Sequence, residues 1–288
     1  MITLTAQPVA AAEGVRSSLG ESPRWDDRSQ TLWWTDIEGG AIYSLDADAA
    51  VVRHPVPRPV GAVMLADEGL VLATTSGFER FDPSTEQLSM MVEIEASDAT
   101  RRMNDASVDP WGGVLGGTMR WDAGVGEHDG ILYRWTPDGG QETVATGLGC
   151  PNGLAWPRSD LFVFIDSLSG GIDLWNVDQA TGSIAGVASR IDTSGFEGIP
   201  DGLTVDEHGH LWVAFWGGGV VRCFDLDGTV LATVAVGTPF VTSAAFGGPD
   251  LGTLYITTAS ASEESPSAGL LYEARPGVTG RAAHRFRR

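Results

Sequence analysis

The stretch Glu197-Gly198-Ile199-Pro200-Asp201-Gly202-Leu203 combines a turn signal with the start of an apolar strand. Pro200 fixes its own φ and biases Ile199 toward extended geometry, and Gly202 permits a sharp turn or the close approach of another group. Leu203 and Val205 then alternate with polar residues, and residues 211–215 form a further, continuous apolar run. Pro-Asp-Gly alone is an ordinary turn signal. In this context it predicts that a carboxylate, Asp201, is held on a stiff turn that leads into a β-strand.

Related stretches recur along the whole chain. In each unit a small or polar turn leads into an apolar strand, which is followed by a second apolar strand and a third that carries an aromatic residue. The units begin at Gly20, Gly61, Asn104, Asn152, Asp201 and Ser243. Segments with helical periodicity are almost absent. A strand-only repeat of about 40 to 50 residues is typical of propellers, so we predict an all-β fold with residues 1–288 forming a single six-bladed β-propeller.

The ends of the chain and one internal segment have weaker patterns. We expect Ile2-Thr3-Leu4-Thr5 to close the ring by adding a strand to the last blade. Residues 260–268 have no strand pattern and predict a flexible loop, and we expect the tail Arg281–Arg288 to be disordered.

The charge and residue usage exclude several classes of function. The formal net charge of −20 repels nucleic acid and anionic membranes and attracts cations. Lysine is absent, which excludes Schiff-base chemistry on lysine and a P-loop. Cys150 and Cys223 are far apart and lack CxxC spacing. No apolar run approaches the roughly 20 residues of a membrane span, and no signal-peptide pattern is present. We expect a cytoplasmic protein with free thiols, as a monomer or a small homo-oligomer.

Four polar residues stand at matching positions of the repeat, at the start of the innermost strands: Glu21, Asn104, Asn152 and Asp201. Each alone could be an ordinary turn residue. Because the innermost strands of a propeller line one channel, we expect these side chains to converge. Carboxylate and amide oxygens suit a divalent cation, and two close carboxylates without a cation would be costly. The absence of His and Cys at these positions disfavours a closed structural zinc site.

Several motifs carry a resemblance to a known family: Gly20-Glu21-Ser22-Pro23, Arg102-Met103-Asn104-Asp105, Gly117-Thr118-Met119, Asn152-Gly153-Leu154, Ile165-Asp166-Ser167 and Pro200-Asp201-Gly202. In order and over nearly the whole chain, they resemble the senescence marker protein-30/gluconolactonase family. The resemblance implies a six-bladed propeller, sugar lactonase activity and one divalent metal ion in the central channel. It implies Glu21, Asn152 and Asp201 as metal ligands, and Arg102, Asn104 and Asp122 as substrate-binding residues.

Two departures from the family pattern bear on the substrate. Cys150-Pro151 precede Asn152 where Thr or Ser is usual, and Trp121 makes the loop at Asp122 bulkier. Neither departure touches the implied metal ligands.

The function that follows is metal-dependent hydrolysis of sugar lactones, such as gluconolactone or pentonolactones, to the aldonic acid. We predict Asp201 as the general base, with Ca, Zn, Mn or Fe(II) as the metal. Ser/His/Asp catalysis is disfavoured because no Gly-x-Ser-x-Gly elbow is present, and His128 is at most a residue at the channel rim. Two alternatives stay open: a propeller hydrolase of other esters or organophosphates, and a non-catalytic calcium-binding regulator.

Overall fold

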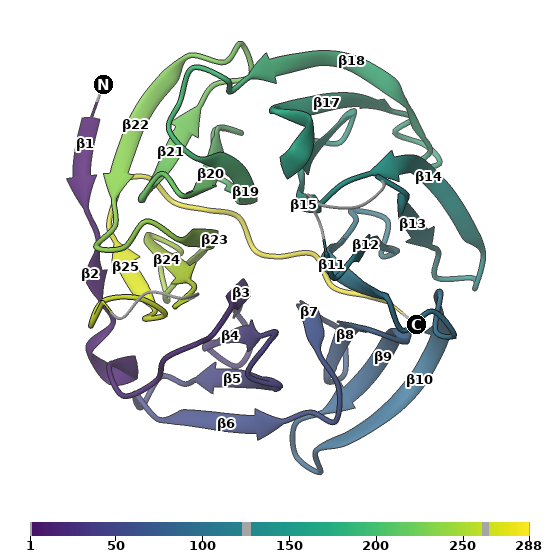
Figure 1. Cartoon of the computed structure of the whole chain (residues 1–288), viewed down its shortest axis with the longest axis horizontal. Helices are drawn as coiled ribbons and strands as arrows, with labels where there is room; N and C mark the ends of the chain where they lie inside the picture. The colour runs from purple at the N-terminus through teal and green to yellow at the C-terminus, as the bar shows by residue number, and fades with distance from the viewer. Residues whose placement is uncertain (1, 123–127, 261–264, 288) are drawn as a thin grey trace.

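Six sheets, antiparallel except for one added N-terminal strand, stand around a common centre in the computed structural model of the chain (Figure 1). The structure describes residues 2–122, 128–260 and 265–287. Successive sheets follow one another along the chain, and the first strand of each lies nearest the centre. The prediction of an all-β six-bladed propeller is therefore confirmed.

The first three blades are regular four-stranded meanders. Blade 1 consists of β3 (Gly20–Asp26), β4 (Thr31–Asp36), β5 (Ala41–Leu45) and β6 (Val51–Pro55). Blade 2 consists of β7 (Val60–Leu65), β8 (Leu70–Thr74), β9 (Gly77–Asp82) and β10 (Gln87–Glu93). Blade 3 consists of β11 (Arg101–Val108), β12 (Val114–Arg120), β13 (Gly130–Trp135) and β14 (Gln141–Leu148).

The next three blades include both N-terminal strands. Blade 4 consists of β15 (Pro151–Arg158), β16 (Leu161–Asp166), β17 (Gly171–Val177) and β18 (Ile184–Asp192). Blade 5 consists of β19 (Ile199–Val205), β20 (Leu211–Trp216), β21 (Val220–Phe224), β22 (Val230–Ala235) and β1 (Ile2–Thr5). Blade 6 consists of β23 (Val241–Gly247), β24 (Thr253–Thr258), β25 (Tyr272–Ala274) and β2 (Gln7–Pro8).

The N-terminus closes the ring differently from the expectation. β1 pairs in parallel with β22 of blade 5 rather than with the last blade, and β2 is the strand that completes blade 6 by pairing with β25. β1 covers the open outer edge of β22, which would otherwise present unpaired backbone groups. Leu4 also packs against the core between these two blades. The N-terminal segment therefore joins two blades instead of extending one.

The hydrophobic core is divided among the gaps between neighbouring blades. In β20, Trp212 and Ala214 pack toward blade 6, whereas Val213 and Phe215 pack toward blade 4. Successive strand residues point to opposite faces of a sheet, so a strand that is buried on both faces must be apolar at consecutive positions. This explains the continuous apolar runs in the sequence.

The described part of the C-terminal tail is ordered, contrary to the expectation of disorder. It crosses the centre of the ring after β25 (Figure 1). Phe286 is fully buried, stacks on Trp135 with ring centroids 5.2 Å apart, and forms a parallel bridge with Ala66. Residues 281–284 line a cavity together with the C-terminal ends of the innermost strands. The tail therefore covers one end of the channel. No helix in the described ranges is long and apolar enough to cross a membrane.

Candidate active site

The pairing between the first and second strands is interrupted at the same level in every blade. The register shifts lie between Glu21/Arg24, Val60/Ala62, Met103/Ala106, Asn152/Leu154, Pro200/Leu203 and Val241/Ser243. Bulges of this kind re-aim side chains and often occur beside functional sites. The residues at this level are Glu21, Gly61, Asn104, Asn152, Asp201 and Thr242. The repeated irregularity thus places Glu21, Asn104, Asn152 and Asp201 around one axis, at the end of the channel opposite the tail.

The innermost strands of neighbouring blades approach one another closely at this level. A Cβ on Gly202 would lie 2.2 Å from Ser243 Oγ of the next blade, and one on Gly61 would lie 2.1 Å from the carbonyl oxygen of Asn104. Both distances are far below van der Waals contact. Glycine is therefore required here for close approach between blades, one of the two roles that the sequence allowed for Gly202.

The polar residues line a cavity of about 270 Å³. Its walls are formed by Leu19, Glu21, Arg102, Asn104, Cys150, Asn152, Ser167, Leu168, Ile199, Asp201 and Trp216. Five of the six residues that the sequence nominated for the site are in this set. Their roles as ligands, base and substrate contacts remain predictions.

The electrostatics of the cavity are dominated by buried carboxyl groups. Burial, followed by the charge of Asp105, raises the pKa of Glu21 from 4.5 to about 8. Burial and the charge of Glu21 raise the pKa of Asp201 well above its usual value. Oδ1 of Asp201 is buried and has no hydrogen-bond partner among the described residues. An unpartnered carboxylate oxygen beside a second carboxylate fits a bound cation, which would lower the cost of ionising both groups.

The amide of Asn152 is held in place by its neighbours. Its Nδ2 donates to Ser167 Oγ at 2.8 Å, and that hydroxyl donates to the carbonyl oxygen of Pro200 at 2.6 Å. Oδ1 of Asn152 accepts a hydrogen bond from Asn104 Nδ2 at 2.7 Å, which leaves one lone pair for a ligand. The sequence predicted no role for Ser167, although this residue belongs to Ile165-Asp166-Ser167, one of the motifs that carry the family resemblance.

Arg102 is the buried cation of the cavity. It donates to Asn104 Oδ1 through one Nη, and its Nε is buried without a partner among the described residues. Its guanidinium lies 5.2 Å from the ring centroid of Trp121. Because Arg102 lines the cavity, its guanidinium suits a substrate oxygen.

Asp122 is not brought to the cavity wall. Its side chain is 53% exposed and pairs with Arg120 at 2.8 Å. The residues that follow, 123–127, lie outside the described ranges. A substrate contact of Asp122 therefore has no support from the geometry and stays a prediction. His128, which the sequence suggested at most as a residue at the channel rim, is exposed.

Cys150 lines the cavity but is unsuited to act as a nucleophile. Burial, followed by the charge of Asp201, raises the pKa of its thiol to about 12. The thiolate is the reactive form of cysteine, so this side chain contributes shape rather than covalent chemistry.

The mouth of the cavity is apolar on one side. Leu168 is 36% exposed and Ile199 is 39% exposed, and both line the cavity beside Trp216. The sequence did not predict this apolar rim, because Leu168 follows β16 in a short 3-10 turn and meets Ile199 only in the folded ring.

The family described as SMP-30/Gluconolactonase/LRE-like region matches residues 19–260. The chain belongs to this family. Among its SMP-30/gluconolactonase relatives, the pentonolactonase XacC of Haloferax volcanii is 36% identical over 93% of this chain and 94% of that protein. Regucalcin of Xenopus laevis is 33% identical over 84% of this chain and 83% of its own. The structure of the calcium-binding protein regucalcin from Agrobacterium tumefaciens aligns with a TM-score of 0.93 and 28% identity over 100% of both chains.

Proposed function

We propose that this SMP-30/gluconolactonase family member hydrolyses sugar lactones with the help of one divalent cation. The observation that carries the proposal is the pair Glu21 and Asp201, two buried carboxyl groups with raised pKa values in one cavity, of which Asp201 has an unpartnered Oδ1. The 36% identity to a pentonolactonase over 93% of the chain supports the reaction class.

Glu21, Asn152 and Asp201 would hold the cation. Two carboxylates and an amide oxygen form an all-oxygen donor set, which suits Ca²⁺ and Mn²⁺ and is also accepted by Zn²⁺ and Fe²⁺. When bound, the cation polarises the lactone carbonyl and stabilises negative charge on its oxygen.

Asp201 is the general base in this proposal. Its carboxylate accepts a proton from the water whose oxygen attacks the carbonyl carbon, and the bond between that carbon and the ring oxygen then breaks. The same carboxyl group returns the proton to the ring oxygen, which leaves as a hydroxyl group. Arg102 holds the substrate through its guanidinium. Asn104 is hydrogen-bonded to both Arg102 and Asn152, so it fixes the substrate site relative to the cation site.

The dimensions of the cavity favour a small substrate. A volume of about 270 Å³ accommodates a single-ring lactone rather than an oligosaccharide. Beyond the three residues assigned to the cation, the wall offers few groups for sugar hydroxyls, chiefly Arg102 and Asn104. We therefore propose pentonolactones, which carry fewer hydroxyls than hexonolactones, as the first substrates to test.

The test is hydrolysis of a lactone panel by chelator-stripped protein with each divalent ion added back. We expect turnover only with metal, and Asp201→Asn to reduce kcat by at least about a hundredfold. Asp225→Asn is the matched control, because Asp225 lies in the same blade but caps the turn after β21 by accepting from Thr229 N. Metal binding without lactone turnover would instead support a calcium-binding regulator, and faster turnover of aryl esters or organophosphates would support the other hydrolase.

A further inference from the structure

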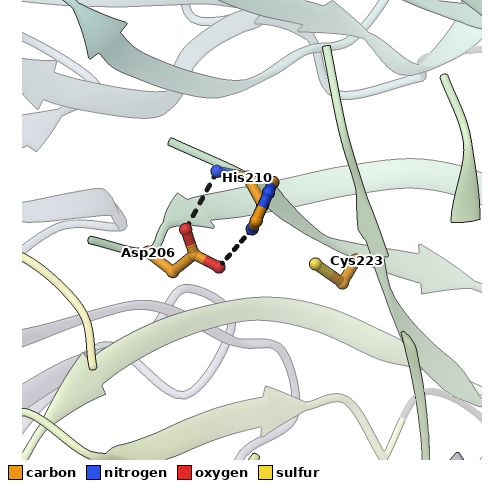
Figure 2. A group of neighbouring side chains, drawn as sticks. All are labelled: Asp206, His210 and Cys223. Atoms are coloured by element: carbon orange, nitrogen blue, oxygen red, sulfur yellow. Dashed lines mark hydrogen bonds and ion pairs between the residues drawn. The ribbon is translucent and has the colours of Figure 1, made fainter. Parts of the chain in front are cut away.

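A second group of metal-binding side chains lies in blade 5, outside the channel site. The ligand atoms of Asp206, His210 and Cys223 all lie within 4.8 Å of one another (Figure 2). Asp206 and His210 belong to the turn between β19 and β20, and Cys223 belongs to β21. Asp206 and Cys223 are almost completely buried, whereas the His210 side chain is 31% exposed.

The two carboxylate oxygens of Asp206 have different hydrogen-bond partners. Oδ1 accepts the backbone N–H groups of His208 and His210, both at 2.9 Å, and so fixes the turn. Oδ2 accepts from Trp212 Nε1 at 3.1 Å and lies 3.0 Å from His210 Nδ1 (Figure 2). Oδ2 is therefore the oxygen that can take part in a site with His210 and Cys223.

Blade 3 contains the same turn with a different partner. There Asp109 accepts the backbone N–H groups of Trp111 and Gly113 through Oδ1, while its Oδ2 is bound by Arg134 Nε at 2.8 Å. Arg134 stands opposite Leu115, the second residue of β12. The matching position in blade 5, opposite the second residue of β20, is Cys223.

Blade 5 therefore buries the equivalent carboxylate without the guanidinium. Asp206 is 1% exposed, and His210 is the one basic side chain within ion-pair distance of it in the described part of the chain. A buried carboxylate is stabilised by hydrogen bonds, by a compensating cation or by both. The cation that pairs with Asp109 in blade 3, Arg134, thus has no counterpart at the matching position of blade 5, where Cys223 stands.

We propose that Asp206 Oδ2, His210 Nδ1 and Cys223 Sγ bind one transition-metal ion of the Zn²⁺ type. A thiolate, an imidazole and a carboxylate select such ions over Ca²⁺ and Mg²⁺. Metal–ligand bonds of about 2.0 Å place neighbouring N and O ligands roughly 3.3 Å apart in a tetrahedron, close to the 3.0 Å between Oδ2 and Nδ1. The thiol proton is released to solvent on binding, and water reaches the fourth position past the partly exposed His210.

The site ties the β19–β20 turn to the third strand of the blade, so its role is structural. The geometry gives no support for a cysteine nucleophile, because burial raises the pKa of the Cys223 thiol to about 12. The site shares no residue with the channel site, and the two sites differ in chemistry, because the proposed donors in the channel are all oxygen atoms.

Cobalt(II) titration of the chelator-stripped full chain tests the proposal, with Asp201→Asn used to weaken the channel site. We expect a thiolate-to-cobalt charge-transfer band in the near ultraviolet, displaced by Zn²⁺ and lost in Cys223→Ser. Cys150→Ser is the matched control and should keep the band, since Cys150 lies in the channel wall. His210→Gln should weaken Zn²⁺ binding at this site by about tenfold or more.

The lactonase assay separates this site from the channel. Cys223→Ser in the otherwise native chain should keep metal-dependent turnover, which also shows that the variant folds. His210→Gln changes a partly exposed side chain and is the second variant if Cys223→Ser is unstable. The absence of a charge-transfer band, or a band lost in Cys150→Ser and kept in Cys223→Ser, would overturn the proposal and leave His210 itself as the cation that compensates Asp206.

Discussion

The side chain of Asn152 in β15 is anchored by Ser167, which lies in the turn after β16, through a hydrogen bond of 2.8 Å from Nδ2 to Oγ. This bond directs the Asn152 amide oxygen into the cavity. Side chains that orient a metal ligand in this way typically contribute tenfold to a hundredfold in metal affinity.

Ser167→Ala should therefore weaken cation binding in the channel by about tenfold or more while the fold is kept. Calorimetric titration of chelator-stripped protein measures the change. Ser169→Ala is the control, because Ser169 lies in the same turn but donates to the carbonyl oxygen of Asp166. Equal affinities for the two variants would show that Ser167 does not position Asn152.

The raised pKa values of Glu21 and Asp201 predict how the metal-free protein responds to pH. Burial and Asp105 hold the folded-state pKa of Glu21 at about 8, above its ordinary 4.5, and Arg102 and Arg24 offset this only in part. A group with a raised folded-state pKa contributes its full stability below the unfolded-state pKa and loses it as pH rises through the folded-state value. The metal-free protein should therefore lose stability between about pH 4.5 and pH 8.

Denaturant unfolding in chelator at both ends of that range measures this loss. Asp201→Asn removes one of the repelling carboxylates, so the metal-free variant should be more stable than the wild type at the upper end by on the order of 2 kcal/mol. Saturating divalent cation should reverse the order, because the wild type alone keeps the complete ligand set. Parallel pH profiles of the two metal-free proteins would argue against mutual repulsion in the cavity.

The apolar rim of Leu168 and Ile199 predicts a substrate preference. Leu168→Asn should lower kcat/KM for lactones that carry an alkyl substituent by about three- to tenfold relative to a polyhydroxylated lactone, because an apolar contact is lost. Val187→Asn is the control, since Val187 is 50% exposed on the outer strand of blade 4. If Leu168→Asn leaves the ratio of kcat/KM for the alkyl lactone to kcat/KM for the polyhydroxylated lactone unchanged, the alkyl substituent does not contact Leu168.

The buried ring of Phe286 predicts that the tail stabilises the ring of blades. Phe286→Ala should lower the free energy of unfolding by about 3 kcal/mol, as expected for removing a fully buried phenylalanine. The neighbouring Arg287→Ala, at an exposed position, should change it by less than about 0.5 kcal/mol. Thermal and denaturant unfolding measure the change in the free energy of unfolding for both variants. If Phe286→Ala has an effect as small as that of Arg287→Ala, the tail does not stabilise the ring.

The number of blades and the convergence of Glu21, Asn104, Asn152 and Asp201 could be predicted from the sequence. Both follow from the repeat, because equivalent positions of a closed ring must face the same axis. The resemblance to the SMP-30/gluconolactonase family then added Arg102, which the structure places in the same cavity.

Other features depended on partners distant in the chain. The pairing of β1 with β22, the burial of Phe286 and the exposure of Asp122 have no local signal. The same is true of the group formed by Asp206, His210 and Cys223, where the sequence shows only two widely separated cysteines and a turn. The sequence repeat determines which residue of each blade faces the central axis. Only the closed ring decides which segments contact the strand edges, the C-terminal tail and the third strands, because these contacts join segments that are not related by the repeat.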